Sequence, residues 1–371
     1  MFARSLGFLL LTAALFCVQS FAQDKTKIPE EEGVVRVETD LVDVPISVQD
    51  KSGRPILSLK RANFRVFEDG VLQDIAEFST TSAPFEIAVL LDTSGSTRSE
   101  LETIRRAAQH FIDSLRPGDR VAIIAFRTGT EDNRPIAVSE VVSFMTGDRN
   151  ELRESLGRVG TSNGTPYYDA LISVVERVFR DEAKNEFRGR RALVALTDGV
   201  DSASSSGFEE ARELLEKSGI ASYFIRVDTR PFFEDNLMGD CQTAIRFSQA
   251  QIKRYYASFD PKTGMERTFD FCKLGEFERL AISKRLYEVA DEEMKMLAKT
   301  SGGRIFEITG LSDARTAFRQ VAEEIGTKYS IGYYPKNEKH DGSYRRLRVE
   351  LKGVPAGAVV ASREGYQAPR N

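Results

Sequence analysis

From residue 85 to about residue 326, short apolar runs alternate with stretches in which apolar residues recur every three or four positions. The short runs predict buried strands, and the wider spacing predicts amphipathic helices. Because alternating strands and helices form a parallel sheet covered on both faces, we predict an α/β domain with a doubly wound, mostly parallel, Rossmann-like central sheet. The expected strands are 85–92, 120–126, 136–144, 191–198, 220–228 and 302–308, and the expected helices are 100–117, 167–180, 207–218 and 311–326.

The segments on either side of this domain have the alternation typical of strands. Residues 35–83 alternate apolar and polar positions, and Glu68-Asp69-Gly70 separates two such runs as a hairpin turn does. Residues 327–371 return to the same pattern. Each segment has too few strands to be stable alone, and each leaves open edges. We therefore predict that the two segments pair in one small, immunoglobulin-like all-β domain, beside a central domain of residues 84–326.

The first residues have the pattern of a targeting segment. Arg4 precedes an apolar run at 6–18, and Ser20-Phe21-Ala22 offers small residues at the positions that a signal peptidase requires. We predict a signal peptide at 1–22 and a flexible lead-in at 23–34. An uncleaved N-terminal anchor is the alternative. Export implies a secreted or periplasmic protein, with no membrane span after cleavage.

The bulk composition is that of a soluble globular protein. Hydrophobic residues make up 41% and charged residues 29%, and the formal net charge of −4 argues against a nucleic-acid partner.

A long interruption of the strand and helix pattern, at about 229–285, contains both cysteines that lie beyond the signal peptide. An even pair of cysteines in an exported chain predicts a disulfide between Cys241 and Cys272, and two free buried thiols are the alternative. Because no Cys/His cluster is present, a structural zinc site is not expected. The interruption is interpreted as an insertion that packs against the sheet edge, with a partner-contact surface as the second interpretation.

Oxygen-bearing side chains follow the ends of two predicted strands and precede one predicted helix. They are Asp92, Ser94 and Ser96 in the sequence Asp-Thr-Ser-Gly-Ser, Thr165 before a helix, and Asp198 after a strand. Ligands bind beyond the carboxyl ends of parallel strands, so we expect these groups to converge, with the two acids at the rim of the sheet. Carboxylate and hydroxyl oxygens are preferred ligands of Mg²⁺, Mn²⁺ and Ca²⁺. Helix capping by the same residues is the simpler alternative.

These residues resemble the metal-ion-dependent adhesion site of von Willebrand factor A and integrin I domains. The resemblance implies that Ser94, Ser96 and Thr165 ligate a divalent cation through hydroxyl groups, while Asp92 and Asp198 act largely through bound water. The likeness covers about residues 84–326, less the insertion. The flanks, with Asn63 to Gly70 and Ile331 to Pro335, resemble secreted VWFA-related proteins of the acidobacterial type.

The two carboxylates only balance the charge of a divalent cation, which leaves the cation able to coordinate an outside acid. We therefore expect an exported, metal-dependent protein-binding, adhesion or assembly module whose partner presents Asp or Glu, and we expect no enzymatic activity. A metal-dependent hydrolase and a structural module with an inactive metal site are the alternatives. A serine hydrolase needs a catalytic histidine, but His110 lies in a predicted helix and His340 in the distant tail.

Overall fold

The central domain is built on a six-stranded sheet with the strand order β10-β9-β8-β5-β6-β7. The structure is a computed structural model, and it describes residues 41–370 except 53, 81–82, 182, 185–186, 188 and 260–269. The expected signal peptide, the lead-in and residues 35–40 of the first β segment therefore lie outside the described residues. All neighbouring strands run parallel except β7, which pairs antiparallel with β6 at one edge. The strands are β5 (Glu86–Leu91), β6 (Arg120–Glu131), β7 (Arg134–Thr146), β8 (Arg191–Thr197), β9 (Ala221–Val227) and β10 (Arg304–Ile308).

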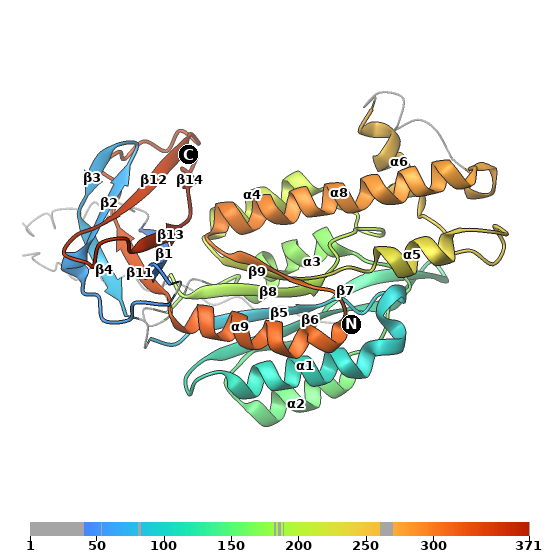
Figure 1. Ribbon diagram of the computed structural model, residues 1–371, viewed down its shortest axis with the longest axis horizontal. Helices are drawn as coiled ribbons and strands as arrows, with labels where there is room; N and C mark the ends of the chain where they lie inside the picture. The colour runs from blue at the N-terminus through green and yellow to red at the C-terminus, as the bar shows by residue number, and fades with distance from the viewer. Residues whose placement is uncertain are drawn as a thin grey trace, which may run out of the picture. The chain divides into compact units, whose positions relative to one another are not determined.

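Helices cover both faces of this sheet (Figure 1). Helices α1, α2 and α9 contribute to the core on one face, and α3, α4 and α8 contribute to the core on the other. The doubly wound, mostly parallel architecture expected from the sequence is thus present. Within the described residues, no helix combines the length and hydropathy of a membrane-spanning segment. The helices are α1 (Leu101–Ser114), α2 (Arg149–Arg158), α3 (Tyr167–Ser173), α4 (Phe208–Ser218), α8 (Glu276–Ser301) and α9 (Ala314–Gly326).

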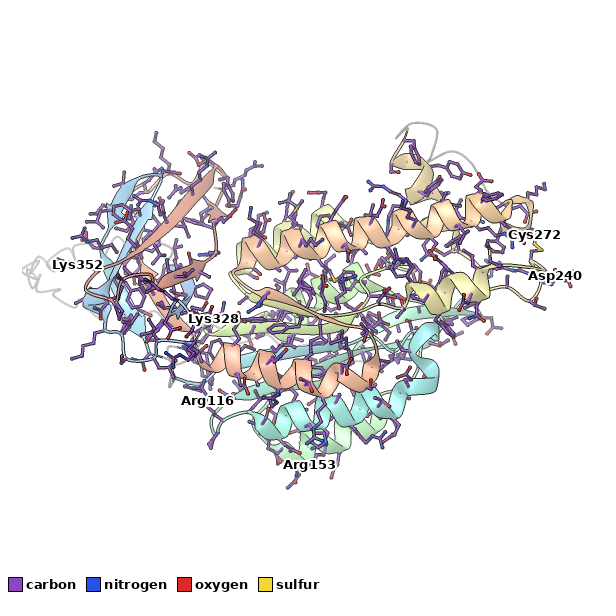
Figure 2. The ribbon with its side chains drawn as sticks, viewed as in Figure 1. Arg116, Arg153, Asp240, Cys272, Lys328 and Lys352 are labelled. Atoms are coloured by element: carbon purple, nitrogen blue, oxygen red, sulfur yellow. A yellow bond between two sulfur atoms is a disulfide. The ribbon has the colours of Figure 1, made fainter. Side chains whose placement is uncertain are left out.

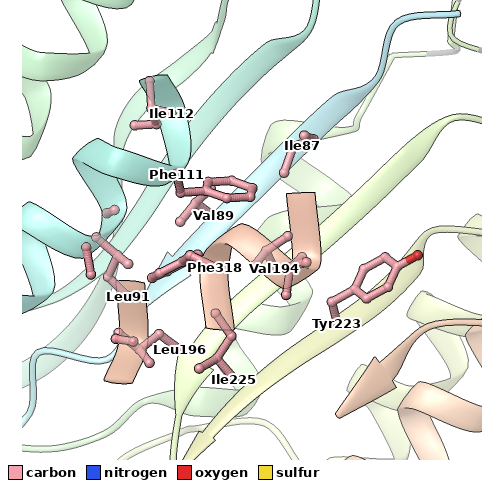
Figure 3. Close-up of a cluster of buried hydrophobic side chains, with 14 of the residues drawn as sticks. Ile87, Val89, Leu91, Phe111, Ile112, Val194, Leu196, Tyr223, Ile225 and Phe318 are labelled. Carbon is pink, nitrogen blue, oxygen red and sulfur yellow. The ribbon is translucent and has the colours of Figure 1, made fainter. Parts of the chain in front are cut away.

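The apolar central strands are buried on both faces because alternate residues enter different cores. Ile87, Val89 and Leu91 of β5 point towards the helices α1 and α9, whereas Ala88 and Leu90 enter the opposite core. Figure 3 shows the first of these clusters, where Phe111 of α1 and Phe318 of α9 lie over the sheet with ring centroids 5.1 Å apart. This packing fixes the strand ends, from which the candidate site is built.

Strands from the two flanking segments pair with one another in two antiparallel four-stranded sheets. In one sheet β1 lies between β13 and β11, and β11 also pairs with β4; in the other, β12 lies between β14 and β2. The hairpin turn at Asp69 and Gly70 has positive φ at both residues, as a two-residue hairpin loop requires. The domain boundaries and the immunoglobulin-like assignment stay predictions. The strands are β1 (Val42–Gln49), β2 (Phe64–Glu68), β3 (Val71–Gln73), β4 (Ile75–Ser79), β11 (Tyr329–Tyr333), β12 (Tyr344–Leu351), β13 (Val359–Ser362) and β14 (Gly365–Gln367).

The insertion after β9 contains the helices α5 (Arg230–Leu237) and α6 (Gln249–Ala257) and runs into α8. The expected disulfide is present: Cys241 and Cys272 are bonded, with Cα atoms 5.2 Å apart, and Cys272 lies near the outer end of α8 (Figure 2). A separate apolar cluster, which includes Leu237, Phe247 and Ile252, forms the core of the insertion.

The expected end of the insertion near Arg285 stays a prediction, and it falls within α8, which continues without a break from Glu276 to Ser301. Ile282 and Leu286, in its first half, belong to the core of the insertion, whereas Met294 and Leu297, in its second half, belong to the core of the sheet. Helix α8 therefore connects the core of the insertion to the core of the central domain.

Candidate metal centre

The two acids predicted for the site follow neighbouring strands. Asp92 follows β5 and Asp198 follows β8, and these strands pair in parallel, with Leu91 opposite Leu196. From β5 the chain continues to β6 on one side, and from β8 it continues to β9 on the other, so the strand order reverses between them. Such a switch point is where open parallel sheets bind ligands.

Hydrogen bonds join the three loops that carry the predicted ligands. Ser162 donates its backbone N–H to the carbonyl oxygen of Thr93 at 2.8 Å, which ties the loop before α3 to the loop after β5. On the other side, Thr165 donates its backbone N–H to the hydroxyl oxygen of Ser202 at 2.8 Å. The backbone N–H of Ser202 in turn donates to the carbonyl oxygen of Thr165 at 3.0 Å. Thr165 and the β8 loop are thereby held together.

Asp92 is buried, which corrects the expectation that both acids lie at the rim. Its side chain accepts hydrogen bonds from the Thr197 hydroxyl at 2.8 Å and from the Ser94 backbone N–H at 3.1 Å. Burial raises the pKa of Asp92, and the hydrogen bonds from Ser94 and Thr197 only partly oppose this shift. The carboxylate is thus fixed in place but is costly to ionise without a cation.

Asp198 is half-buried and faces the insertion. One oxygen accepts the Val200 backbone N–H at 2.9 Å, and the other accepts the hydroxyl of Thr229, which lies 2.8 Å from the hydroxyl of Tyr287 on α8. Burial raises the pKa of Asp198 to about 7, and the negative charge of Asp92 adds to the shift. The two carboxylates are therefore close enough to repel each other.

The donor set fits a hard divalent cation. Among the ion pairs of the described residues, none involves Asp92 or Asp198, so no described cation balances the charge of this acidic pair. Hydroxyl-bearing Ser94 and Thr165 lie beside Asp198. Ser96 belongs to the short helix η2 (Gly95–Glu100), but its side chain lies outside the described part of the structure. The described residues hold no cluster of three or more His, Cys, Asp or Glu, so any cation here depends on hydroxyl ligands.

Asp201 and Arg254 support this site, although neither was predicted from the sequence. Asp201 is buried and accepts hydrogen bonds from the backbone of Tyr167 at 2.9 Å, which fixes the start of α3. Arg254 of the insertion pairs with Asp201 at 3.2 Å. A third acid three residues after Asp198 was a visible signal, but the partner Arg254 is 53 residues further along the chain.

A cavity of about 370 Å³ lies over the site. Ser94, Thr165 and Asp198 line it on the sheet side. The insertion and α8 form the opposite wall, with Phe233, Phe247, Leu286 and Tyr287. Residues of the insertion therefore face Ser94, Thr165 and Asp198 across this cavity.

One nearby motif bears on the hydrolase alternative. Gly160-Thr161-Ser162-Asn163-Gly164 has the spacing of a serine-hydrolase nucleophile. That nucleophile must sit between a strand and a helix with its hydroxyl exposed. Ser162 instead lies between the two helices α2 and α3, is fully buried, and accepts the Gly164 backbone N–H at 3.3 Å. The motif therefore gives no support to a serine hydrolase.

Comparison with known proteins agrees with this arrangement. Residues 87–200 match the family model of the von Willebrand factor type A domain. This chain contains a von Willebrand factor type A domain. The match spans the loops of Asp92, Thr165 and Asp198 and ends before the insertion. Among curated proteins, no sequence matches the chain significantly.

Several solved structures are similar over longer spans but at low identity. A von Willebrand factor type A protein from Catenulispora acidiphila is 12% identical, with 91% of this chain and 75% of that chain covered and a TM-score of 0.42. The pilus adhesin SpaC from Lactobacillus rhamnosus GG is 10% identical, with 87% and 48% covered and a TM-score of 0.41. Proximal thread matrix protein 1 from the mussel byssus is 12% identical, with 65% and 48% covered and a TM-score of 0.40. The chain thus spans about half of the last two proteins.

Proposed function

We propose that this protein is an exported binding module, in which a divalent cation held by Asp92, Ser94, Ser96, Thr165 and Asp198 coordinates an acidic group of a partner protein. The observation that carries the proposal is the acidic pair at the switch point between β5 and β8. Two buried or half-buried carboxylates repel each other there, and no ion pair of the described residues neutralises them. A bound cation would remove this repulsion.

The cation would supply an open coordination position for an outside oxygen. Two acids balance its double charge, and hydroxyl ligands add none, so an incoming carboxylate gains direct attraction. The chain's own groups prepare the site: Thr197 and the Ser94 backbone hold Asp92, and Thr229 orients Asp198. The cavity gives a partner group access to Ser94, Thr165 and Asp198.

Affinity capture tests this function. The mature protein is immobilised and incubated with envelope and secreted fractions of its source, either in Mg²⁺ or in EDTA. A partner of the metal site binds wild type in Mg²⁺, is released by EDTA, and does not bind the Asp198→Ala variant. The Asp235→Ala variant is the matched control, because Asp235 is an exposed acid of α5 that does not line the cavity. Capture that survives both EDTA and Asp198→Ala contradicts the proposal.

A further inference from the structure

The insertion makes the cavity over the metal centre chemically two-sided. Its sheet side is polar, with Ser94, Thr165 and Asp198, whereas the opposite wall is apolar and aromatic. Phe233 of α5 packs against Phe247 with ring centroids 5.4 Å apart and against Tyr287 at 6.4 Å. The cluster behind the wall and the Cys241–Cys272 bond hold it in place, so the cavity is preformed.

A second hollow, also of about 370 Å³, lies beside the first and shares its lining at Asn163, Arg246 and Phe247. It extends to Pro135 and Ala137 at the start of β7. A compact ligand fills only one such hollow, whereas an extended chain can lie across both. Asn163 and Gln251 also belong to the shared lining; their amide oxygens accept hydrogen bonds from Thr128 and Ser248, so it is their amide N–H groups that can donate to a peptide backbone.

Arg246 gives this shared lining a positive charge. Its side chain is exposed, and its Nε donates to the carbonyl oxygen of Cys241 at 2.9 Å, which fixes the guanidinium beside the disulfide. Within the described residues Arg246 takes part in no ion pair. The cavity thus combines an acid-binding position at the metal, an apolar wall and a cation, which together complement an acidic and apolar chain.

From this two-sided cavity we infer that the ligand is an extended peptide segment in which an Asp or Glu is followed or preceded by a large apolar residue. The acid reaches the cation at Asp198, and the apolar side chain lies against Phe233, Phe247 and Leu286. Further chain continues past Arg246, which favours a second acid there. The inference rests on the proposed metal site but goes beyond it, because the metal selects only the acid and the insertion selects its neighbour.

Peptide selection tests this inference on the mature, full-length protein. A displayed library of random heptapeptides is bound in Mg²⁺ and eluted with EDTA. We expect the eluted peptides to be enriched in Asp or Glu next to Phe, Tyr, Leu, Ile or Met. Enrichment of the acid without an apolar neighbour overturns the inference but leaves the metal site standing. Enrichment that persists with Asp198→Ala overturns both, and no enrichment despite saturable Mg²⁺ binding overturns the inference alone.

Two matched pairs of variants test whether Phe233 and Arg246 of the insertion contact the peptide. The best peptide should bind Phe233→Ser about tenfold more weakly than wild type, because an apolar contact is lost. Phe232→Ser is the control and should not change binding. The ring of Phe232 is adjacent in sequence, but it is 49% exposed and does not line the cavity. Arg246→Gln should weaken binding about threefold, and Lys273→Gln, an exposed cation of the insertion outside both hollows, should have no effect. Equal binding by both members of each pair overturns the inference.

Discussion

The two walls of the candidate site are built in different ways. On the sheet side, polar groups sit where parallel strands end, so the strand order alone brings Asp92 and Asp198 together. On the insertion side, Phe233 and Phe247 are placed by a small separate core and a disulfide. On the sheet side burial raises the pKa of both acids, and the charge of Asp92 raises that of Asp198 further, whereas the insertion side is stabilised by apolar burial. In our proposal, the sheet side binds the metal and the insertion side selects the ligand.

The sharpest consequence of this difference is a pH dependence on the sheet side alone. In the unfolded chain Asp198 ionises near its ordinary pKa of 3.8, but in the folded, metal-free protein its pKa is about 7. The folded state therefore binds more protons between these values, and its stability falls as the pH rises from about 4 to about 7. The slope from this group is at most about 1.4 kcal/mol per pH unit.

Denaturant unfolding of wild type and Asp198→Asn in EDTA measures this slope, because other titrating groups cancel in the difference. The variant should gain stability relative to wild type as the pH rises through this range. Saturating Mg²⁺ should abolish the gain. A difference that stays constant across the pH range would show that Asp198 is not destabilised by its surroundings.

The insertion wall should depend on its disulfide. Replacement of Cys241 and Cys272 by Ser opens a loop with a sequence separation of 31 residues. The chain-entropy model gives a loss of about 4 kcal/mol, which falls on the insertion. We expect hydrogen exchange in α5 and α6 to accelerate while exchange in β5 and β8 stays slow. Equal acceleration in the sheet would mean that the two walls are not separate units.

Arg254 joins the two walls, because it lies on α6 and pairs with the buried Asp201. It also lies over the ring of Tyr168 at 4.9 Å. Arg254→Gln leaves Asp201 buried without its cation and should lower the free energy of unfolding by about 2 kcal/mol, since Arg254 itself is partly exposed. Lys253→Gln, the neighbouring substitution, is the control. Thermal unfolding of the two variants measures the difference, and equal melting temperatures would contradict the account.

The smallest expected effect is that of a single hydroxyl ligand. Ser94→Ala should weaken Mg²⁺ binding about tenfold, because water can replace a neutral ligand. Thr97→Ala serves as the control, since the Thr97 hydroxyl donates to backbone carbonyl oxygens of the same loop and not to Asp198. Competition against a fluorescent Mg²⁺ indicator measures both affinities. A larger loss with Thr97→Ala would mean that loop shape, and not the Ser94 hydroxyl, controls binding.

The features that could be predicted from the sequence are those that depend on local patterns of apolar and polar residues or on simple counts. The apolar runs before Asp92 and Asp198 give both the strands and the position of the acids, and an even cysteine count gives the disulfide. Helix α8 was missed because it packs against two different cores and therefore lacks one clean apolar stripe. The cavity wall and the Arg254–Asp201 pair were missed because they depend on contacts between distant segments.

Calorimetric titration of the protein with Mg²⁺, Mn²⁺ and Ca²⁺ tests the proposed metal centre most directly. The account predicts one saturable site per chain for at least one of these cations. It predicts loss of that binding, by more than about 100-fold, in folded Asp92→Ala and Asp198→Ala variants, because each removes half of the charge that balances the cation. No saturable binding of any of the three cations by wild type, or equal binding by Asp92→Ala, would contradict it.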